Sequence, residues 1–167
     1  VFIVYALTPL FIVLVTSVKT EKQMYENVLS IPAELHPENY KAVWIDRGFH
    51  GYFLNSVYVT FPTVFIVLIC SSLAGYAFAK MTFKGKEFLF YLFLIGLMIP
   101  IPSLMIPLYR NLNILKLLDN RIGLILPEAA FAMPFGIFLM RTFFRGIDDE
   151  ILEAARIDGA GELRLVL

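Results

Sequence analysis

The chain has 167 residues, of which 59% are hydrophobic and 17% are charged, and its formal net charge is zero. A soluble domain is usually about half apolar and about a quarter charged. The apolar excess lies in long uninterrupted blocks, so lipid is the expected solvent for much of the chain. A neutral chain without a basic stripe is unsuited to bind nucleic acid, and we predict no nucleic-acid partner.

Cysteine and histidine usage argues against two kinds of site. Cys70 is the single cysteine, so an intrachain disulfide is impossible. Because it lies inside an apolar run, we expect a small buried thiol. His36 and His50 stand apart, without the spacing of metal ligands. We therefore predict no metal site and no cofactor.

Four apolar blocks follow one another along the chain, at residues 1–18, 53–79, 88–109 and 122–140. Each is close to the roughly 20 residues that a helix needs to cross a bilayer. Helices are expected because an open strand in lipid leaves backbone polar groups unpaired. We predict an all-α membrane protein with about four spans, and we expect the chain to be a partial helical bundle.

The connections between the blocks differ in charge density. Residues 19–52 form a long polar loop, whereas residues 80–87 are short and basic and residues 141–167 are charged. With residues 110–121 counted on the same face as 19–52, each face carries seven lysine and arginine residues, but the face with 80–87 and 141–167 packs them into shorter segments. Cytoplasmic loops are enriched in these residues, so we place that face in the cytoplasm. The long loop is then external, with aromatic side chains to anchor it at the interface: Tyr40, Trp44, Phe49 and Tyr52.

The second and third spans carry unusual residues. Small side chains near the end of the second span predict that another helix approaches closely: Ser71, Ser72, Ala74, Gly75, Ala77 and Ala79. In the third span, Pro100 and Pro102 remove backbone donors and bend or end the helix. One interpretation is a plain helix terminus. The other is a broken helix with Pro100 and Pro102 lining the pathway, where protein or water satisfies the freed carbonyls.

Residues 147–161 form a pattern typical of a short amphipathic helix outside the spans. Asp148 is placed to cap its N-terminus, and Gly159 is placed to end it in a left-handed conformation. One apolar face recurs at helical spacing: Ile147, Ile151, Ala154 and Ala155. The polar face is mostly acidic, and anionic lipid would repel it. A protein groove is therefore a better partner for this helix than the membrane surface.

The same segment is similar to a known motif. Glu153-Ala154-Ala155 followed by Ile157-Asp158-Gly159-Ala160 resembles the EAA loop of type I ABC-importer permeases. Further stretches occur in the order of the carbohydrate-uptake permeases of the maltose-permease G-subunit kind: Asn55–Val57, Ala77–Lys80, Phe83–Gly85, Met98–Pro100, Ile106–Tyr109, Asp119–Asn120, Gly123–Leu126, Pro134–Gly136 and Arg141–Phe144. The resemblance covers nearly the whole chain.

The resemblance implies a transport mechanism. Two permease subunits, as a heterodimer, form a pathway for a sugar or oligosaccharide across the bacterial cytoplasmic membrane. Two ATP-binding cassette ATPase subunits lie beneath them, and an extracytoplasmic solute-binding protein delivers the solute. The EAA helix sits in a groove of the ATPase and couples its closure to alternating access. The implied ATPase-coupling residues are Glu153, Ala154, Ala155, Asp158 and Gly159.

The resemblance also implies the domain organisation. Residues 1–52 are a first transmembrane helix with its external loop, and residues 53–167 are an inner-membrane transport domain that is incomplete at its C-terminus. The chain has no glycine-rich phosphate loop, so we expect a transport subunit and not an enzyme. One departure is Asp148, where the family commonly has proline, although both residues suit a helix start. Arg164 and Leu165 also stand where a more aromatic run is expected.

Glu128 lies within the fourth apolar block, where a carboxylate should face protein or water and not lipid. It is a candidate pathway-lining acceptor for sugar hydroxyls. Alternatively, it pairs with a partner subunit or reaches the nearby outer surface. Two other functions stay open. One is a membrane scaffold that recruits a soluble partner through the helix at 147–161. The other is a permease for a non-sugar solute such as glycerol phosphate or a polyamine.

Overall fold

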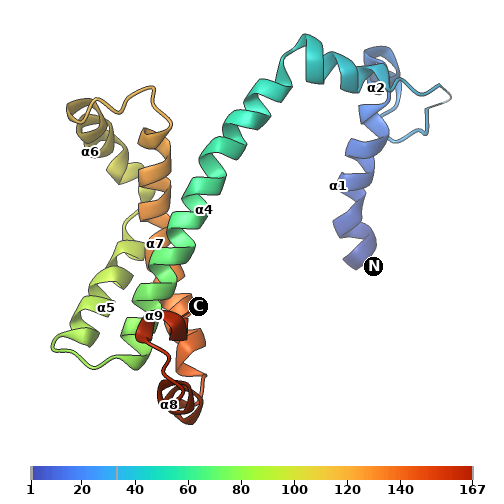
Figure 1. The fold of residues 1–167 in the computed structure, drawn as a ribbon. Helices are drawn as coiled ribbons and strands as arrows, with labels where there is room; N and C mark the ends of the chain where they lie inside the picture. Colours follow the sequence, from blue (N-terminus) through green and yellow to red (C-terminus); the bar gives the residue numbers. More distant parts are fainter. Residues whose placement is uncertain (1, 33, 167) are drawn as a thin grey trace. The chain divides into compact units, whose positions relative to one another are not determined.

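The computed structural model describes residues 2–32 and 34–166. Across these residues every regular element is a helix and no strand is formed, which confirms the predicted all-α class. The chain divides into two compact units, Val1–Asn55 and Ser56–Leu167. Figure 1 shows the helices coloured along the sequence.

The first unit holds one apolar helix and several short polar ones: α1 (Phe2–Ser17), α2 (Glu21–Glu26), α3 (Glu38–Lys41), the π-helix η1 (Ala42–Asp46) and the first turns of α4 (Phe49–Lys80). The described part of the first predicted span is α1, which has 16 residues. This is shorter than the roughly 20 residues that cross a bilayer core.

The predicted polar loop between the first two spans is folded around a buried lysine. Lys19 is only 4% exposed, and its ammonium donates to the carbonyls of Asn27 at 2.9 Å and Val28 at 3.0 Å. The hydroxyls of Ser17 and Tyr40 hydrogen-bond at 2.6 Å. The aromatic residues predicted to anchor this loop are all exposed: Tyr40, Trp44, Phe49 and Tyr52.

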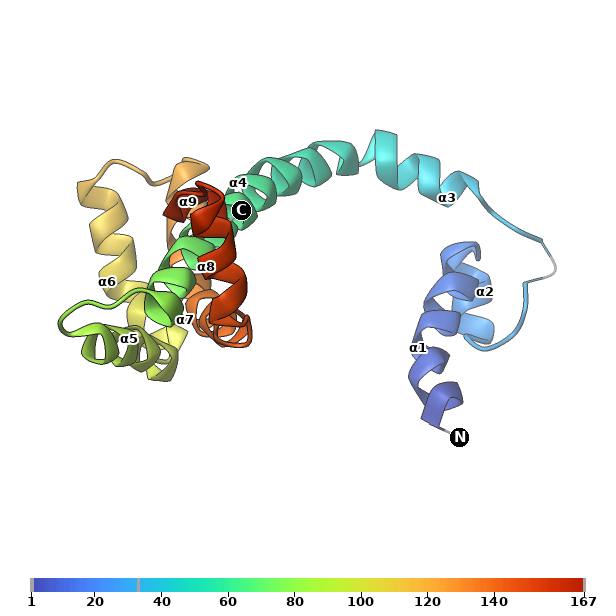
Figure 2. The ribbon, with the colours of Figure 1, turned by 60° about the horizontal axis from the view of Figure 1, so that its bottom comes forward.

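In the described part of the chain, two helices are long and apolar enough to cross a membrane, and most of their residues belong to the second unit. These are α4, with 32 residues, and α7 (Ile122–Arg145), with 24 residues. A third candidate span is bent: α5 (Lys86–Ile95) with the 3₁₀ turn η2 (Gly96–Met98) meets α6 (Ile101–Ile114) at 100°. Figure 2 shows α5 and α6 as two separate arms on either side of this bend.

The bend has its cause in the prolines. Pro100 takes an extended conformation with ψ 126°, and Pro102 lies in the first turn of α6. Neither residue has a backbone N–H to continue the hydrogen bonds of α5, whereas proline is well tolerated at a helix start. The structure therefore has a broken helix here and not a plain terminus. The helix α6 also continues beyond the predicted end of the apolar block at residue 109, to Ile114.

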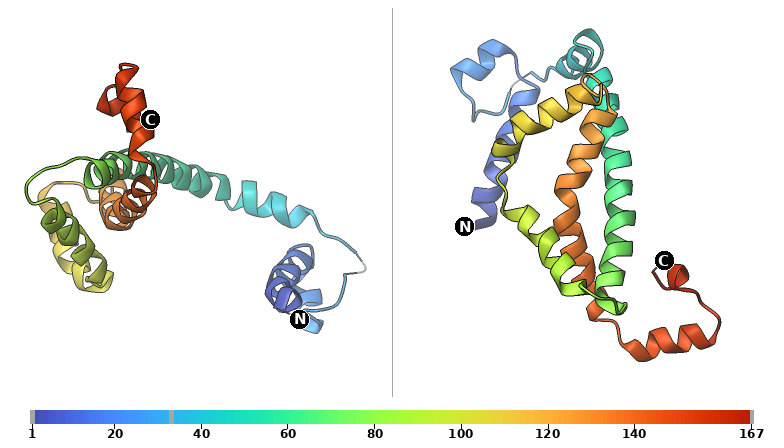
Figure 3. Two further views of the ribbon diagram at one scale, coloured as in Figure 1. Left: turned by 90° about the horizontal axis from the view of Figure 1, so that it is seen from below. Right: turned by 90° about the vertical axis from the view of Figure 1, so that its left-hand side faces the viewer.

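Small residues bring α4 and α7 together, as the sequence predicted. Ser71 and Gly75 of α4 are buried. A Cβ added to Gly136 of α7 would overlap the side chain of Ser71, and one added to Gly75 would lie 2.5 Å from the Cβ of Met140. Figure 3, right, shows the two helices running side by side. Beside this crossing, a small core joins α4, α5 and α7: Phe78, Phe90 and Ile137.

Most of the apolar surface of the spans is exposed in the single chain. Leucine, isoleucine and phenylalanine side chains cover the outside of α4, α5 and α7, which suits helices surrounded by lipid tails or by further apolar helices. Cys70 belongs to this outer surface. The expectation of a buried thiol was therefore wrong, because an apolar run in a membrane helix does not imply burial inside the same chain.

Candidate coupling site

The segment predicted to be an amphipathic helix forms α8 (Asp149–Ile157). It crosses the end of the second unit where α4 and α7 finish and α5 begins (Figure 3). Asp148 occupies the N-cap position with an extended backbone, but its side chain makes no capping hydrogen bond. The sequence therefore predicted the position of Asp148 correctly, but the expected hydrogen bond from its side chain is not formed. Acidic residues in the first turn and Arg156 in the last turn suit the helix dipole.

The end of α8 is set by Gly159, as predicted. Gly159 has φ +87°, a left-handed conformation that glycine adopts without a Cβ penalty. The amide of Ala160 donates to the carbonyl of Ala155 at 2.9 Å, and that of Gly159 donates to Arg156 at 3.0 Å. These bonds satisfy carbonyls that a helix end leaves free. Asp158 is the C-cap residue and is exposed.

The face of α8 that packs inward is not the apolar face counted in the sequence, which was expected to meet a partner protein. Leu152 is the buried residue, at 7% exposure, and Ala155 is half-buried. Ile151, at 61% exposure, and Ala154 point outward. The sequence prediction missed Leu152 because it counted the face from Ile147. Counting from Asp149 at three- and four-residue steps gives Leu152 and Arg156, which is the face that meets the bundle.

The outward face of α8 is acidic with small and apolar residues at its centre. Glu150, Ala154 and Ile157 recur at helical spacing, and Ile157 is 87% exposed. Glu153 and Asp158 flank this row and are exposed. Within the described residues, Glu153 forms neither an ion pair nor a hydrogen bond with another side chain. The structure therefore brings four of the five predicted coupling residues to an accessible surface, with Ala155 turned partly inward.

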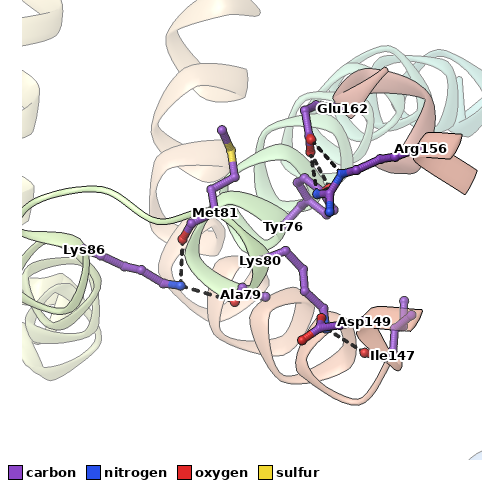
Figure 4. A network of polar contacts seen from close by, with 9 residues as sticks. All are labelled: Tyr76, Ala79, Lys80, Met81, Lys86, Ile147, Asp149, Arg156 and Glu162. Atoms are coloured by element: carbon purple, nitrogen blue, oxygen red, sulfur yellow. Dashed lines mark hydrogen bonds and ion pairs between the residues drawn. The ribbon is translucent and has the colours of Figure 1, made fainter. Parts of the chain in front are cut away.

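The two ends of α8 are tied to α4 (Figure 4). Lys80, at the end of α4, donates to the carbonyl of Ile147 at 2.6 Å and to the carboxylate of Asp149 at 2.5 Å. At the other end, the Tyr76 hydroxyl donates to Glu162 at 2.5 Å, and Glu162 also pairs with Arg156 at 3.1 Å. Glu162 opens the last short helix, α9 (Glu162–Val166).

The contacts at the two ends of α8 shift the pKa values of three charged side chains. The hydrogen bond and the positive charge of Lys80 hold the pKa of Asp149 below its ordinary value. The Tyr76 hydroxyl, and after it Arg156, lower the pKa of Glu162. Glu162 in turn raises the pKa of Arg156. These shifts favour the charged forms of Asp149, Glu162 and Arg156.

A second polar cluster joins α5 and α7 at the same end of the unit. Arg141 is 4% exposed; its guanidinium pairs with Glu87, donates to the carbonyl of Phe78 at 3.2 Å and lies 3.7 Å from the centre of the Phe90 ring. Arg145 also approaches Glu87, at 3.5 Å. The basic residues assigned to one face by sequence thus gather at one end of the spans.

The candidate pathway residues are less closely associated. Pro100 and Pro102 are exposed at the bend, where Gly96 of η2 lies close to Pro134 of α7. Glu128 is exposed on α7, and the described part of the chain offers it no hydrogen bond or ion pair. A cavity of about 260 Å³ lies between α6 and α7; Pro127 lines it, whereas Glu128 does not. That Glu128 and the two prolines line a pathway stays a prediction.

Metal binding finds no support in the described residues, since they contain no group of three or more histidine, cysteine, aspartate or glutamate side chains arranged to hold an ion.

These features define a helical membrane protein whose spans carry a short accessible helix across one end. The chain belongs to the family of binding-protein-dependent transport system inner membrane components, which matches residues 68–167. The match includes the second part of α4, from Leu68 onward, and all of α5 to α9. It confirms the resemblance found in the sequence.

Several characterised permeases are similar over most of this chain. The diacetylchitobiose uptake permease NgcG of Streptomyces coelicolor is 36% identical over 161 residues, 96% of this chain and 53% of NgcG. The arabinooligosaccharides permease AraQ of Halalkalibacterium halodurans is 34% identical, over 94% of this chain and 57% of AraQ. The trehalose permease SugB of Mycobacterium tuberculosis is 33% identical, over 93% and 57%. The chain spans about half the length of these relatives.

Proposed function

We propose that this chain belongs to the permease subunit of an ATP-binding cassette importer that moves a sugar or oligosaccharide across the bacterial cytoplasmic membrane by alternating access. Family membership supports the transport role. The names of the three relatives, which concern diacetylchitobiose, arabinooligosaccharides and trehalose, support a carbohydrate solute. In this proposal the permease hydrolyses no ATP and pairs with a second, different permease subunit.

The observation that carries the proposal is the outward face of α8. A nine-residue helix lies across the end of the spans. It exposes Glu153, which has no partner among the described residues, and Ala154, whose side chain is small. A groove with a basic group on an ATPase subunit would pair with this carboxylate and pack against the small side chain. The helix then lies in the cytoplasm, and the loop of the first unit faces the solute-binding protein outside.

A rigid cytoplasmic helix is a suitable element for coupling. Packed elements move as units and switch between discrete arrangements. Rotation of an ATPase subunit that grips α8 would therefore displace the inner ends of the spans and change which side of the membrane the pathway faces. In the proposal, Glu128, Pro100 and Pro102 line this pathway, and residues 53–167 form the transport domain that follows the first helix and loop at 1–52.

The test is a charge reversal at Glu153 in the full-length permease, assembled with its ATPases and binding protein. We expect Glu153→Lys to abolish solute uptake and to weaken co-purification of the ATPase while the permease still inserts. Gly159→Asp, which places a side chain at φ +87°, should act in the same direction. The matched control is Glu21→Lys, an exposed glutamate of α2, which should retain the ATPase. Normal uptake and normal ATPase recovery in both coupling variants would disprove the proposal.

A further inference from the structure

The attachment of α8 to α4 is not required by the course of the chain. α8 follows α7 through three residues, Gly146 to Asp148, so of the two long spans only α7 is directly connected to it along the chain. The polar contacts described above instead join it to α4, an element more than sixty residues earlier in the sequence. A helix attached to α7 only through this linker would be free to rotate about it.

Two residues of α4 make these contacts from one face of the helix. Tyr76 and Lys80 are four residues apart, so their side chains lie one turn from each other on the same side. Lys80 holds the start of α8 through Ile147 and Asp149, and Tyr76 holds the segment after it through Glu162. Contacts at two separated points fix the orientation of α8 against α4 as well as its distance.

Burial makes these contacts stronger than ordinary surface pairs. Tyr76 is 2% exposed, and the side chain of Lys80 is 9% exposed, although Asp149 is 78% exposed. A shielded ammonium requires partners, and the Ile147 carbonyl and the Asp149 carboxylate supply them. Tyr76 packs its ring edge-on against Phe144 of α7 with the centroids 5.5 Å apart, which holds its hydroxyl in place.

We propose that Lys80 and Tyr76 are positioning residues that join α4 and α8 into one rigid lever, so that displacement of α8 by an ATPase moves the inner end of α4 directly. This inference rests on the proposed function, and it adds which span receives the motion and which side chains transmit it. Neither residue touches the ATPase or the solute; both act through the orientation of α8.

The experiment measures solute uptake and ATP hydrolysis together in proteoliposomes that contain the complete importer. Lys80→Gln and Asp149→Asn each remove one partner of the first contact. We expect uptake per ATP hydrolysed to fall by about threefold to tenfold in each, the range expected for coupling between contacting residues, with ATPase association unchanged. The exchange Lys80→Asp with Asp149→Lys should restore part of the ratio, since it forms the ion pair again but leaves the Ile147 carbonyl without the Lys80 donor.

Matched controls lie next to both residues. Lys84→Gln alters an exposed lysine of the same loop, and Asp148→Asn alters an exposed aspartate adjacent to Asp149; both should keep the wild-type ratio. An unchanged ratio in Lys80→Gln and Asp149→Asn would overturn the lever. Loss of ATPase association in these two variants would also overturn it, because it would assign them to docking.

A second measurement separates failure of the lever from failure of the transport role. A spin label at Ile157, in a Cys70→Ser background, reports the mobility of α8 in the full-length permease without its partners. We expect a sharper, more mobile spectrum in Lys80→Gln and Tyr76→Phe than in the parent or in Lys84→Gln. Equal mobility in all four proteins would refute the attachment, even if the uptake test confirms the transport role. Greater mobility in Lys80→Gln and Tyr76→Phe, together with no ATPase binding in the separate co-purification, would count against the transport role alone.

Discussion

Gly75 of α4 and Met140 of α7 lie in direct contact, with no space between them for another side chain. A Cβ on Gly75 would lie 2.5 Å from the Cβ of Met140 and 2.9 Å from the backbone nitrogen of Arg141. The backbone of α7 cannot move locally to make room, because Arg141 is fixed by Glu87 and by the Phe78 carbonyl. The closest approach of the two long spans therefore requires glycine, which has no side chain, at position 75.

Replacing Gly75 by leucine should separate α4 from α7. We expect a loss of about 1–3 kcal/mol, the usual result of inserting carbon atoms into a packed interface, measured as a lower melting temperature of the detergent-solubilised protein. Gly51→Leu is the control, since Gly51 lies in the same helix and a Cβ there meets nothing within 4 Å. Equal melting temperatures for the two variants would contradict the close contact.

Arg141 should be the most sensitive charged residue of the spans. Arg141→Gln removes the ion pair to Glu87 and the contact with the Phe90 ring. Because Glu87 is half-exposed and keeps Arg145 nearby, we expect a loss of about 1–3 kcal/mol, as for a hydrogen bond to a charged group. Chemical unfolding in detergent measures it. Arg145→Gln, which changes a 57% exposed side chain, should cost much less, and a reversed order would be inconsistent with the structure.

The attachment of α8 should survive mild acid. The pKa of Asp149 is lowered by Lys80, so its contribution is present above the unfolded-state pKa and is lost as the pH falls through the lower folded-state value. Label mobility at Ile157 should therefore stay constant from neutral pH to the ordinary carboxyl range and rise only below it. In Asp149→Asn the label should already be more mobile at neutral pH, and the remaining change should follow Glu162, whose pKa is also lowered. A rise near pH 6 would point to another group.

Glu128 distinguishes a transport pathway from a scaffold. If it accepts hydrogen bonds from sugar hydroxyls, Glu128→Leu should reduce uptake by about tenfold or more, because unpaired polar groups of the solute would cost about 1–3 kcal/mol. Glu128→Gln, which keeps an acceptor, should have a smaller effect. ATPase association should be normal in both. A scaffold that recruits a soluble partner through α8 would tolerate both changes without any functional cost.

Local patterns in the sequence predicted many elements of the fold correctly. Apolar blocks predicted α4 and α7 because a bilayer requires long helices with satisfied backbones. Pro100 and Pro102 marked the bend because proline has no donor. Gly159 marked the end of α8 because only glycine adopts that conformation freely. Each of these is decided by a residue's own chemistry or by its nearest neighbours in the chain.

Features that depend on contacts between distant residues were not predicted. The burial of Leu152 and the exposure of Ile151 follow from which side of α8 meets α4, and both faces of this helix carry apolar residues. The exposure of Cys70 was not predicted for a similar reason, since apolar residues cover every side of a membrane helix. Glu162 received no role in the sequence prediction, because its partner Tyr76 lies 86 positions earlier.

By itself, the sequence determined the class of the protein, its apolar helices and the accessible acidic helix with its glycine stop, because solvent preference and backbone freedom are local properties. The tertiary structure decided that α7 packs directly against Gly75, that Arg141 joins α5 to α7, and that Lys80 and Tyr76 hold α8. Those relationships depend on the distance between side chains far apart in the chain, and packing alone sets that distance.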